Sequence, residues 1–226
     1  MTGRTGEEGA GPVPLAGSVG STVAAVDAAG GRGVARPCDH TDNEAVRALF
    51  EELPPLDVLV NGVWGGYERF VGVGELSFGP FWEQPLSLWD DMQRGVRSAY
   101  VASALAAQSM VDRGRGLIVC ISSQAADDFV PPVAYGVAHA AVDRMVADMA
   151  RELEGTEVSA VALHPGLVRT ENVLANAEHF DLSHSQSPEL AGRVVAALAR
   201  DSEAGRENGS VLAVAELAER YGIRDT

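Results

Sequence analysis

Short apolar runs alternate with longer amphipathic stretches along most of the chain. The runs are rich in Val, Ile, Leu and Ala and contain few polar residues, which is typical of strands buried on both faces. The longer stretches repeat apolar residues at helical spacing, as helices do when they cover one face of a sheet. The pattern predicts strands at residues 33–38, 56–61, 116–121, 158–163 and 210–212, and helices at 41–53, 89–111, 133–154 and 187–200.

This alternation predicts an α/β fold with a doubly wound, mostly parallel, Rossmann-like sheet. The chain has 226 residues, about the size of one such domain, and shows neither internal repeats nor a compositional boundary. We therefore expect a single domain over residues 1–226, in which the Gly- and Pro-rich residues 6–18 form a mobile surface segment. Ligands of such sheets bind at the carboxyl ends of the strands, so we expect the chemistry there.

The net charge of the chain limits the classes of partner that it is expected to bind. The formal net charge is −15, which disfavours binding to nucleic acid and to anionic membrane surfaces. No apolar run is long enough to span a membrane and the first residues do not form a signal peptide, so we expect a cytoplasmic protein. Cys38 and Cys120 are predicted to be buried thiols in a reducing compartment. No Cys/His spacing suits a metal, so no metal site is predicted.

Small and polar residues follow four of the predicted strands. Asp39 and His40 follow the first, and Asn61 and Gly62 follow the second. Two serines, Ser122 and Ser123, follow the third strand, with Tyr135 a short loop later, and His164, Pro165 and Gly166 follow the fourth.

This succession resembles the short-chain dehydrogenase/reductase family over about residues 1–5 and 20–222. The likeness is greatest to the subgroup typified by dehydrogenase/reductase member 1, through the aromatic residues 81–83, the segment 135–138 and the ending 219–222. The resemblance implies a small-molecule substrate and NAD(P) as the cofactor, with NADP preferred over NAD.

The resemblance also assigns catalytic residues. Tyr135 matches the catalytic acid/base, and Ser123 or Ser122 matches the serine that hydrogen-bonds the substrate carbonyl. The family's usual interval from the tyrosine points to Ser122, whereas the position after the strand points to Ser123. We prefer Ser123, because loops absorb deletions more easily than strands. The alternative for Tyr135 is a helix tyrosine that lines a solvent pocket.

Six residues are assigned to the cofactor side by the resemblance. They are Arg4 for the extra phosphate of NADP, Asp39 for the adenine ring, Asn61 for tying neighbouring strands, and Pro165, Gly166 and Thr170 for the nicotinamide end. Asp39 and His40 could equally serve only to cap the following helix, where Thr41 and Glu44 have the spacing of a capping box. His164 is expected to be structural and hydrogen-bonded to backbone.

The family's beginning has no counterpart here. The family starts with a strand and a glycine-rich turn whose N–H groups hold the cofactor pyrophosphate at a helix N-terminus. This sequence starts at Met1, where the family is already leaving its second strand. The fold is therefore expected to lack the first strand and the glycine-rich loop. That strand is central, so its loss predicts a gap in the sheet or unpaired backbone groups.

Three polar residues of the family are also replaced. The lysine one turn after the tyrosine is His139, and the chain contains no lysine that could substitute. His139 is shorter than the lysine, and at neutral pH a histidine is mostly uncharged, so it is not expected to supply the lysine's full positive charge. His139 is equally interpreted as a working base or ribose contact and as a partly buried helix histidine. The helix from Trp89 lacks the proton-relay Asn, and the second Asn of the Asn-Asn-Ala-Gly motif is Gly62.

Two explanations fit these differences. A reading frame begun too late explains the missing start but not His139. A protein that has abandoned hydride transfer explains both, with NAD(P) bound weakly or not at all. We further expect that His139→Lys will not by itself restore reductase activity.

Three functions therefore remain. The leading hypothesis is a non-redox enzyme, in which Tyr135 moves a proton and Ser123 holds an oxygen of a small carbonyl or phenolic metabolite during dehydration, isomerisation or cyclisation. The second is an NAD(P)-dependent oxidoreductase that needs further residues upstream. The third is a catalytically inactive subunit that pairs through its long helices with an active relative. A homo-oligomer is expected, with a hetero-oligomer as the alternative.

Overall fold

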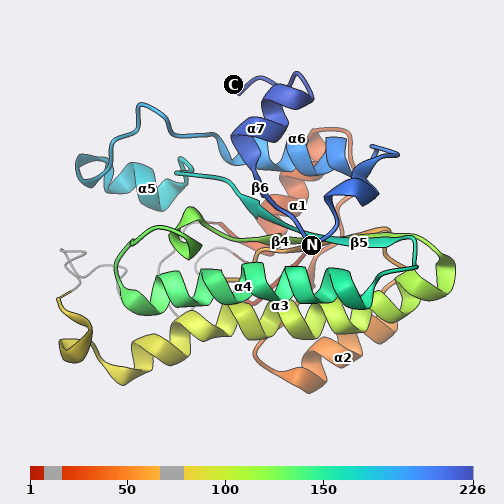
Figure 1. Cartoon of the computed structure of the whole chain (residues 1–226), viewed down its shortest axis with the longest axis horizontal. Helices are drawn as coiled ribbons and strands as arrows, with labels where there is room; N and C mark the ends of the chain where they lie inside the picture. The colour runs from red at the N-terminus through yellow and green to blue at the C-terminus, as the bar shows by residue number, and fades with distance from the viewer. Residues whose placement is uncertain (8–16, 67–78, 226) are drawn as a thin grey trace.

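The computed structural model describes residues 1–7, 17–66 and 79–225. Strands occupy the middle of the molecule and helices cover them from both sides (Figure 1). Most of the segment predicted to be mobile, residues 6–18, lies outside the described residues. In the part of the chain that is described, no helix is long and apolar enough to cross a membrane.

Four parallel strands form the larger sheet. Their order in the sheet is the order in the chain: β3 (Val58–Asn61), β4 (Gly116–Ile121), β5 (Val158–His164) and β6 (Val211–Ala213). Leu117 to Cys120 and Ala160 to Leu163 are buried without interruption. This confirms the prediction that strands with near-continuous apolar runs are covered on both faces.

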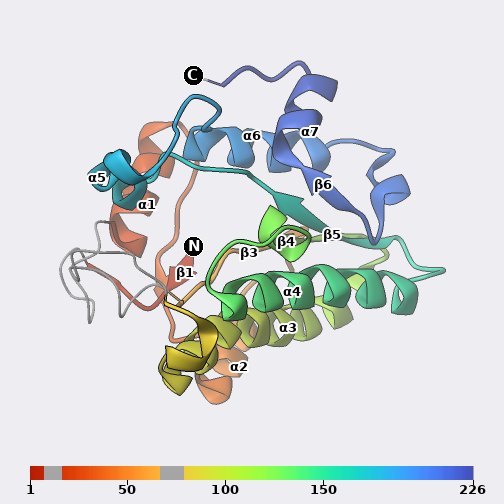
Figure 2. The ribbon, with the colours of Figure 1, turned by 60° about the vertical axis from the view of Figure 1, so that its left-hand side comes forward.

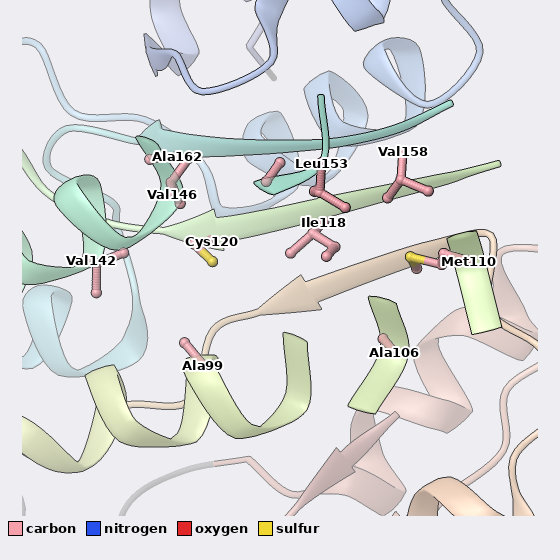
Figure 3. Close-up of a cluster of buried hydrophobic side chains, with 11 residues drawn as sticks. Ala99, Ala106, Met110, Ile118, Cys120, Val142, Val146, Leu153, Val158 and Ala162 are labelled. Carbon is pink, nitrogen blue, oxygen red and sulfur yellow. The ribbon is translucent and has the colours of Figure 1, made fainter. Parts of the chain in front are cut away.

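Helices cover the larger sheet on both faces (Figures 1 and 2), and alternate residues of its strands pack toward one helix layer or the other. Ile118 and Ala160 pack toward α3 (Leu86–Arg113) and α4 (Val133–Glu152), as Figure 3 shows for this cluster. Val119 and Val161 pack instead with α6 (Pro188–Leu198) and α7 (Val214–Arg220). Because side chains alternate along a strand, both faces need apolar residues, and the doubly wound arrangement is confirmed.

A second, smaller sheet stands apart from the first. It pairs β1 (Thr2–Gly3) with β2 (Arg36–Pro37) in parallel. Among the described residues β3 pairs with β4 alone, and the Val60 side chain on β3 is 48% exposed. The division of the strands into two sheets is what the absence of a central strand predicts.

One local prediction was wrong, and one helix was missed. Asp42, not Thr41, caps α2 (Asn43–Glu52): its Oδ1 accepts hydrogen bonds from the N–H groups of Glu44 and Ala45. A helix that the pattern did not predict, α1, spans Val19–Ala28 and buries only Val19. The long helix α3 begins earlier than predicted and ends at Gly114, whose φ of +63° is readily adopted by glycine.

Candidate active site

Tyr135 and Ser123 meet at the carboxyl end of β4. Ser123 caps the short 3₁₀ helix at Gln124–Ala126, and Tyr135 lies in the first turn of α4. The Tyr135 hydroxyl donates to Ser123 Oγ over 3.3 Å. Gly136 makes this approach feasible, because a Cβ there would lie 2.9 Å from the carbonyl oxygen of Ala125. The structure thus brings together the tyrosine and the serine that the sequence analysis preferred.

Ser122 lies deeper and faces a different partner. Its residue is 3% exposed, and its Oγ lies 3.4 Å from His139 Nδ1 and 3.3 Å from the His139 carbonyl oxygen. The Ser122 hydroxyl therefore contacts His139 on α4. Ser123, in contrast, is the serine in contact with the Tyr135 hydroxyl.

His139 is enclosed by rings one turn after Tyr135. Its imidazole stacks on Trp64 with centroids 4.7 Å apart and meets the Tyr135 ring edge-on at 4.5 Å. Burial lowers the pKa of His139 to about 4; the carboxylate of Asp143 opposes this shift and His164 adds to it. His139 is consequently neutral at physiological pH and provides no positive charge beside the tyrosine.

His164 bonds a side chain, not backbone as expected. Its Nε2 lies 2.9 Å from Asp143 Oδ2, and the two side chains are only 10% and 13% exposed. Sequence reasoning missed Asp143. The available signal was its spacing, because Asp143 lies one helical turn after His139 and two turns after Tyr135 on the same side of α4.

Asn61 ties three elements together. Its amide donates to Ser103 Oγ on α3 over 3.0 Å and contacts Cys120 Sγ on β4 at 3.5 Å. Burial raises the pKa of the Cys120 thiol to about 11, so the thiol is protonated. This geometry agrees with the tying role that the resemblance assigns to Asn61.

The residues expected at the adenine end gather near β1 and β2. Asp39 Oδ1 accepts hydrogen bonds from the N–H and hydroxyl of Thr41, and these bonds are the main cause that lowers the pKa of Asp39. The guanidinium groups of Arg4 and Arg94 lower it further. Arg4 therefore lies close enough to Asp39 for its charge to act on that carboxylate.

Neither Asp39 nor His40 caps α2, which corrects the alternative role considered for them. His40 Nε2 hydrogen-bonds Thr2 Oγ1 at 2.8 Å, and the His40 carbonyl accepts from Ser98 on α3. His40 thereby connects β1, the end of β2 and α3.

The segment after β5 is shaped by a glycine turn, a helix cap and a backbone hydrogen bond to a later part of the chain. Gly166 adopts φ +73°, which few side chains tolerate, and Thr170 caps the short helix α5 (Glu171–Ala175) by accepting from Val173 N–H. The Arg169 backbone N–H donates to the Gln186 carbonyl over 2.8 Å. This bond holds the segment after β5 against the part of the chain that leads into α6. Pro165, Gly166 and Thr170 thus follow the carboxyl end of β5. This strand pairs with β4, after which Ser123 and Tyr135 come.

The described residues match two ends of a dinucleotide but not its middle. The resemblance assigns Asp39 and Arg4 to the adenine end and Pro165, Gly166 and Thr170 to the nicotinamide end, and the structure places the first two near β2 and the other three after β5. Between them, β3 has no described neighbour beyond β4, so no strand there leads into a turn whose N–H groups would hold a pyrophosphate. The described residues thus fit the cofactor only in part.

A cavity of about 550 Å³ lies at the opposite ends of the strands, away from the site. Asp57, Gly116 and Val158 line it, and Asp57 is already paired with Arg113 and Arg115 at 2.8 and 3.1 Å. None of the predicted site residues lines it. We therefore place the chemistry at the carboxyl ends, where Tyr135 and Ser123 meet.

Comparison with known families decides the relationship. A family model described as short chain dehydrogenase matches residues 13–179. The chain belongs to the short-chain dehydrogenase/reductase family. This confirms the resemblance that the strand-end residues indicated.

Individual relatives place the chain within this dehydrogenase/reductase family. The mouse protein named dehydrogenase/reductase SDR family member 1 is 40% identical over 215 residues, which cover 87% of this chain and 68% of that protein. Its human counterpart is 38% identical over the same shares. A solved structure titled as a putative NAD(P) dependent gluconate 5-dehydrogenase from Beutenbergia cavernae, with bound NADP, superposes with a TM-score of 0.72 at 26% identity. The superposition covers 87% of this chain and 80% of the chain in that structure.

Proposed function

We propose that this chain is the catalytic part of an NAD(P)-linked oxidoreductase that interconverts a small carbonyl compound and its alcohol. The contact that carries the proposal is the 3.3 Å hydrogen bond from the Tyr135 hydroxyl to Ser123 Oγ. Membership of a family of dehydrogenases supports redox chemistry over the non-redox hypothesis that led the sequence analysis.

The two hydroxyls suit the polarisation of a carbonyl. A substrate oxygen placed between them would accept a hydrogen bond from Ser123 and a proton from Tyr135 during reduction. A bound nicotinamide would supply the hydride. The stacked rings of Trp64 and His139 both contact the Tyr135 ring and cover one side of it.

We propose that the cofactor is NADP in preference to NAD, because Arg4 lies near Asp39 at the adenine end and could pair with a 2′-phosphate. Binding by the 226-residue chain alone should be weak, since its described residues supply no pyrophosphate turn beside β3. Arg4, Asp39, Pro165, Gly166 and Thr170 would contact the two ends of the cofactor.

Calorimetry with NADH and NADPH tests this function first. We expect NADPH to bind more tightly than NADH, with a Kd of about a millimolar, or about 4 kcal/mol. Loss of NADPH absorbance with a panel of small aldehydes and ketones should then report turnover. Absence of both binding and NADPH consumption would refute the oxidoreductase proposal for this chain.

Non-redox acid/base chemistry is the second candidate, and one observation favours it. His139 is neutral and buried where the family has a lysine, so the residue that holds the nicotinamide ribose is replaced. Tyr135 would then move a proton on a carbonyl or phenolic substrate without a cofactor. Exchange of solvent deuterium next to a substrate carbonyl, without added NAD(P) and dependent on the Tyr135 hydroxyl, would support this candidate.

We also propose that the chain assembles with a second copy through α3 and α4. These long helices lie side by side on one face of the sheet, and Tyr100 and Val137 expose apolar surface there (Figure 1). A cytoplasmic location suits the two cysteines, which are free. Light scattering after size exclusion would measure the mass; a monomer, or assembly only with an active relative, would favour the inactive-subunit hypothesis.

A further inference from the structure

A buried cluster of ionisable side chains lies directly behind the Tyr135–Ser123 pair. It comprises His139 and Asp143 on α4 and His164 at the end of β5. His164 Nε2 is 2.9 Å from Asp143 Oδ2, and because an ionised carboxylate can only accept, a hydrogen bond between them to the ionised carboxylate uses a proton on His164 Nε2. The second oxygen, Asp143 Oδ1, is buried and has no hydrogen-bond partner among the described residues.

Asp143 has two imidazoles within reach. His139 lies one turn before it on α4, at the spacing where helix side chains meet. His164 comes from the neighbouring strand and takes up one carboxylate oxygen. Because a buried carboxylate needs a positive or hydrogen-bonding partner, the two histidines compete for the same group.

We propose that His164 is a positioning residue that retains the Asp143 carboxylate and so, together with the burial of the His139 ring, keeps His139 uncharged beside Tyr135. In its absence, Asp143 would turn to His139, which would take up a proton from solvent and become an imidazolium. That would place a cation one turn after Tyr135, where the family has its lysine. This consequence for catalysis rests on the proposed function, whereas the charge of His139 does not.

Among the residues that the structure describes, few other charges near His139 could act in this way. The charged groups that shift the pKa of His139 are Asp143, which raises it, and His164, which lowers it. On β4, Cys120 is a protonated thiol whose pKa the same Asp143 helps to raise. Tyr135 meets the ring edge-on from α4 itself.

On α3, which packs against Trp64 at Gly95, the ionisable pair Asp91 and Arg94 is joined at 3.0 Å. This pair therefore balances its own charge beside the Trp64–His139 stack.

The test follows the His139 ring by NMR, which needs no substrate. The chain has five histidines, so single substitutions assign each imidazole signal. In the unaltered chain the His139 ring should stay neutral from pH 8 down to about 5, since its pKa is lowered to about 4. In His164→Leu its titration midpoint should rise by at least about one pH unit.

Three further variants make the result specific. The double variant Asp143→Asn/His164→Leu should cancel the rise, because the carboxylate that would stabilise the imidazolium is gone. His179→Leu is the matched control, since that histidine is 51% exposed and should leave His139 unchanged. If His164→Leu does not fold, His164→Asn keeps a donor for Asp143 without a charge and should give a smaller rise.

An unchanged His139 midpoint in a folded His164 variant would overturn the proposal, as would a rise that persists in the double variant. Turnover separates the two proposals. A risen midpoint in a chain that consumes no NADPH would leave the role of His164 intact and refute the oxidoreductase function.

Discussion

The four-stranded sheet with its covering helices is built very differently from the N-terminal part of the molecule. The N-terminal part comprises β1, α1 and β2 with the residues that directly follow the two strands, among them Arg4 and residues 38–40. In the first, β4 and β5 are buried along their length and packed from both faces. In the second, β1 and β2 have two residues each, and α1 buries only Val19. Because burial of apolar surface is the main stabilising contribution, the first part should be rigid and the second should open easily.

This difference maps onto the two tasks of the proposed enzyme. Tyr135 and Ser123, which would handle the substrate oxygen, are anchored on β4 and α4 of the well-packed part. Arg4 and Asp39, which would hold the adenine end, follow the short strands of the N-terminal part. In the proposed enzyme the proton chemistry would thus be preorganised, whereas binding of the adenine end of the cofactor would depend on the weaker part.

The largest expected effect is that of Tyr135→Phe. Removing the hydroxyl eliminates the proton donor, so kcat/KM for carbonyl reduction should fall by about 10²–10⁴-fold. Asp39→Asn is the matched change in the N-terminal part and should raise KM for NADPH while leaving kcat nearly unchanged. Steady-state kinetics measure both, and an equal loss of kcat in the two variants would show that the tasks are not divided in this way.

The next effect concerns pH. The pKa of His139 is about 4 in the folded chain and about 6.5 when unfolded, so between these values the unfolded state binds more protons. Stability from this group is complete above about pH 6.5 and is lost as the pH falls toward 4, by up to about 3 kcal/mol.

His139→Gln should remove most of this slope, measured by urea unfolding at a series of pH values. His40→Gln is the counterpart in the N-terminal part, where burial also lowers the histidine pKa while Asp39 opposes it. We expect His40→Gln to change the pH dependence of stability less than His139→Gln does. A slope that survives His139→Gln would mean that another group titrates there.

The third prediction compares the same substitution, valine to alanine, in the two parts of the molecule. Val161 on β5 is fully buried, and Val161→Ala should lower the free energy of unfolding by about 2–3 kcal/mol. Val19 on α1 is 7% exposed, and Val19→Ala should cost about 1 kcal/mol or less, because Val19 belongs to none of the described hydrophobic core clusters. Equal costs in chemical denaturation would contradict the contrast between the two parts.

The smallest effect is a difference in labelling rate between the two free cysteines. Burial raises the pKa of both thiols, so each reacts slowly with a thiol reagent. Cys38 lies in the N-terminal part and Cys120 in β4. Since a buried thiol reacts through local opening, Cys38 should be labelled at least about tenfold faster, as mass spectrometry can follow. Equal rates would indicate that both parts open together.

The sequence predicted the well-packed part closely. The apolar run at 116–121 coincides with β4, and the helix predicted from residue 133 begins there. It did not predict α1, because an alanine-rich stretch with one buried residue carries no apolar stripe. Neither could it choose the cap of α2, since Thr41 and Asp42 are adjacent residues of capping type and only the backbone geometry selects Asp42.

The sequence by itself determined the family, the parallel sheet with helices on both faces, and the replacement of a lysine by His139, because apolar periodicity and residue identity are local properties. Tertiary structure decided what those residues do. It selected Ser123 over Ser122 as the partner of Tyr135, joined His164 to Asp143, and set the neutral state of His139. Each of these depends on burial and on distances between residues far apart in the chain, which fix both hydrogen-bond partners and the cost of a charge.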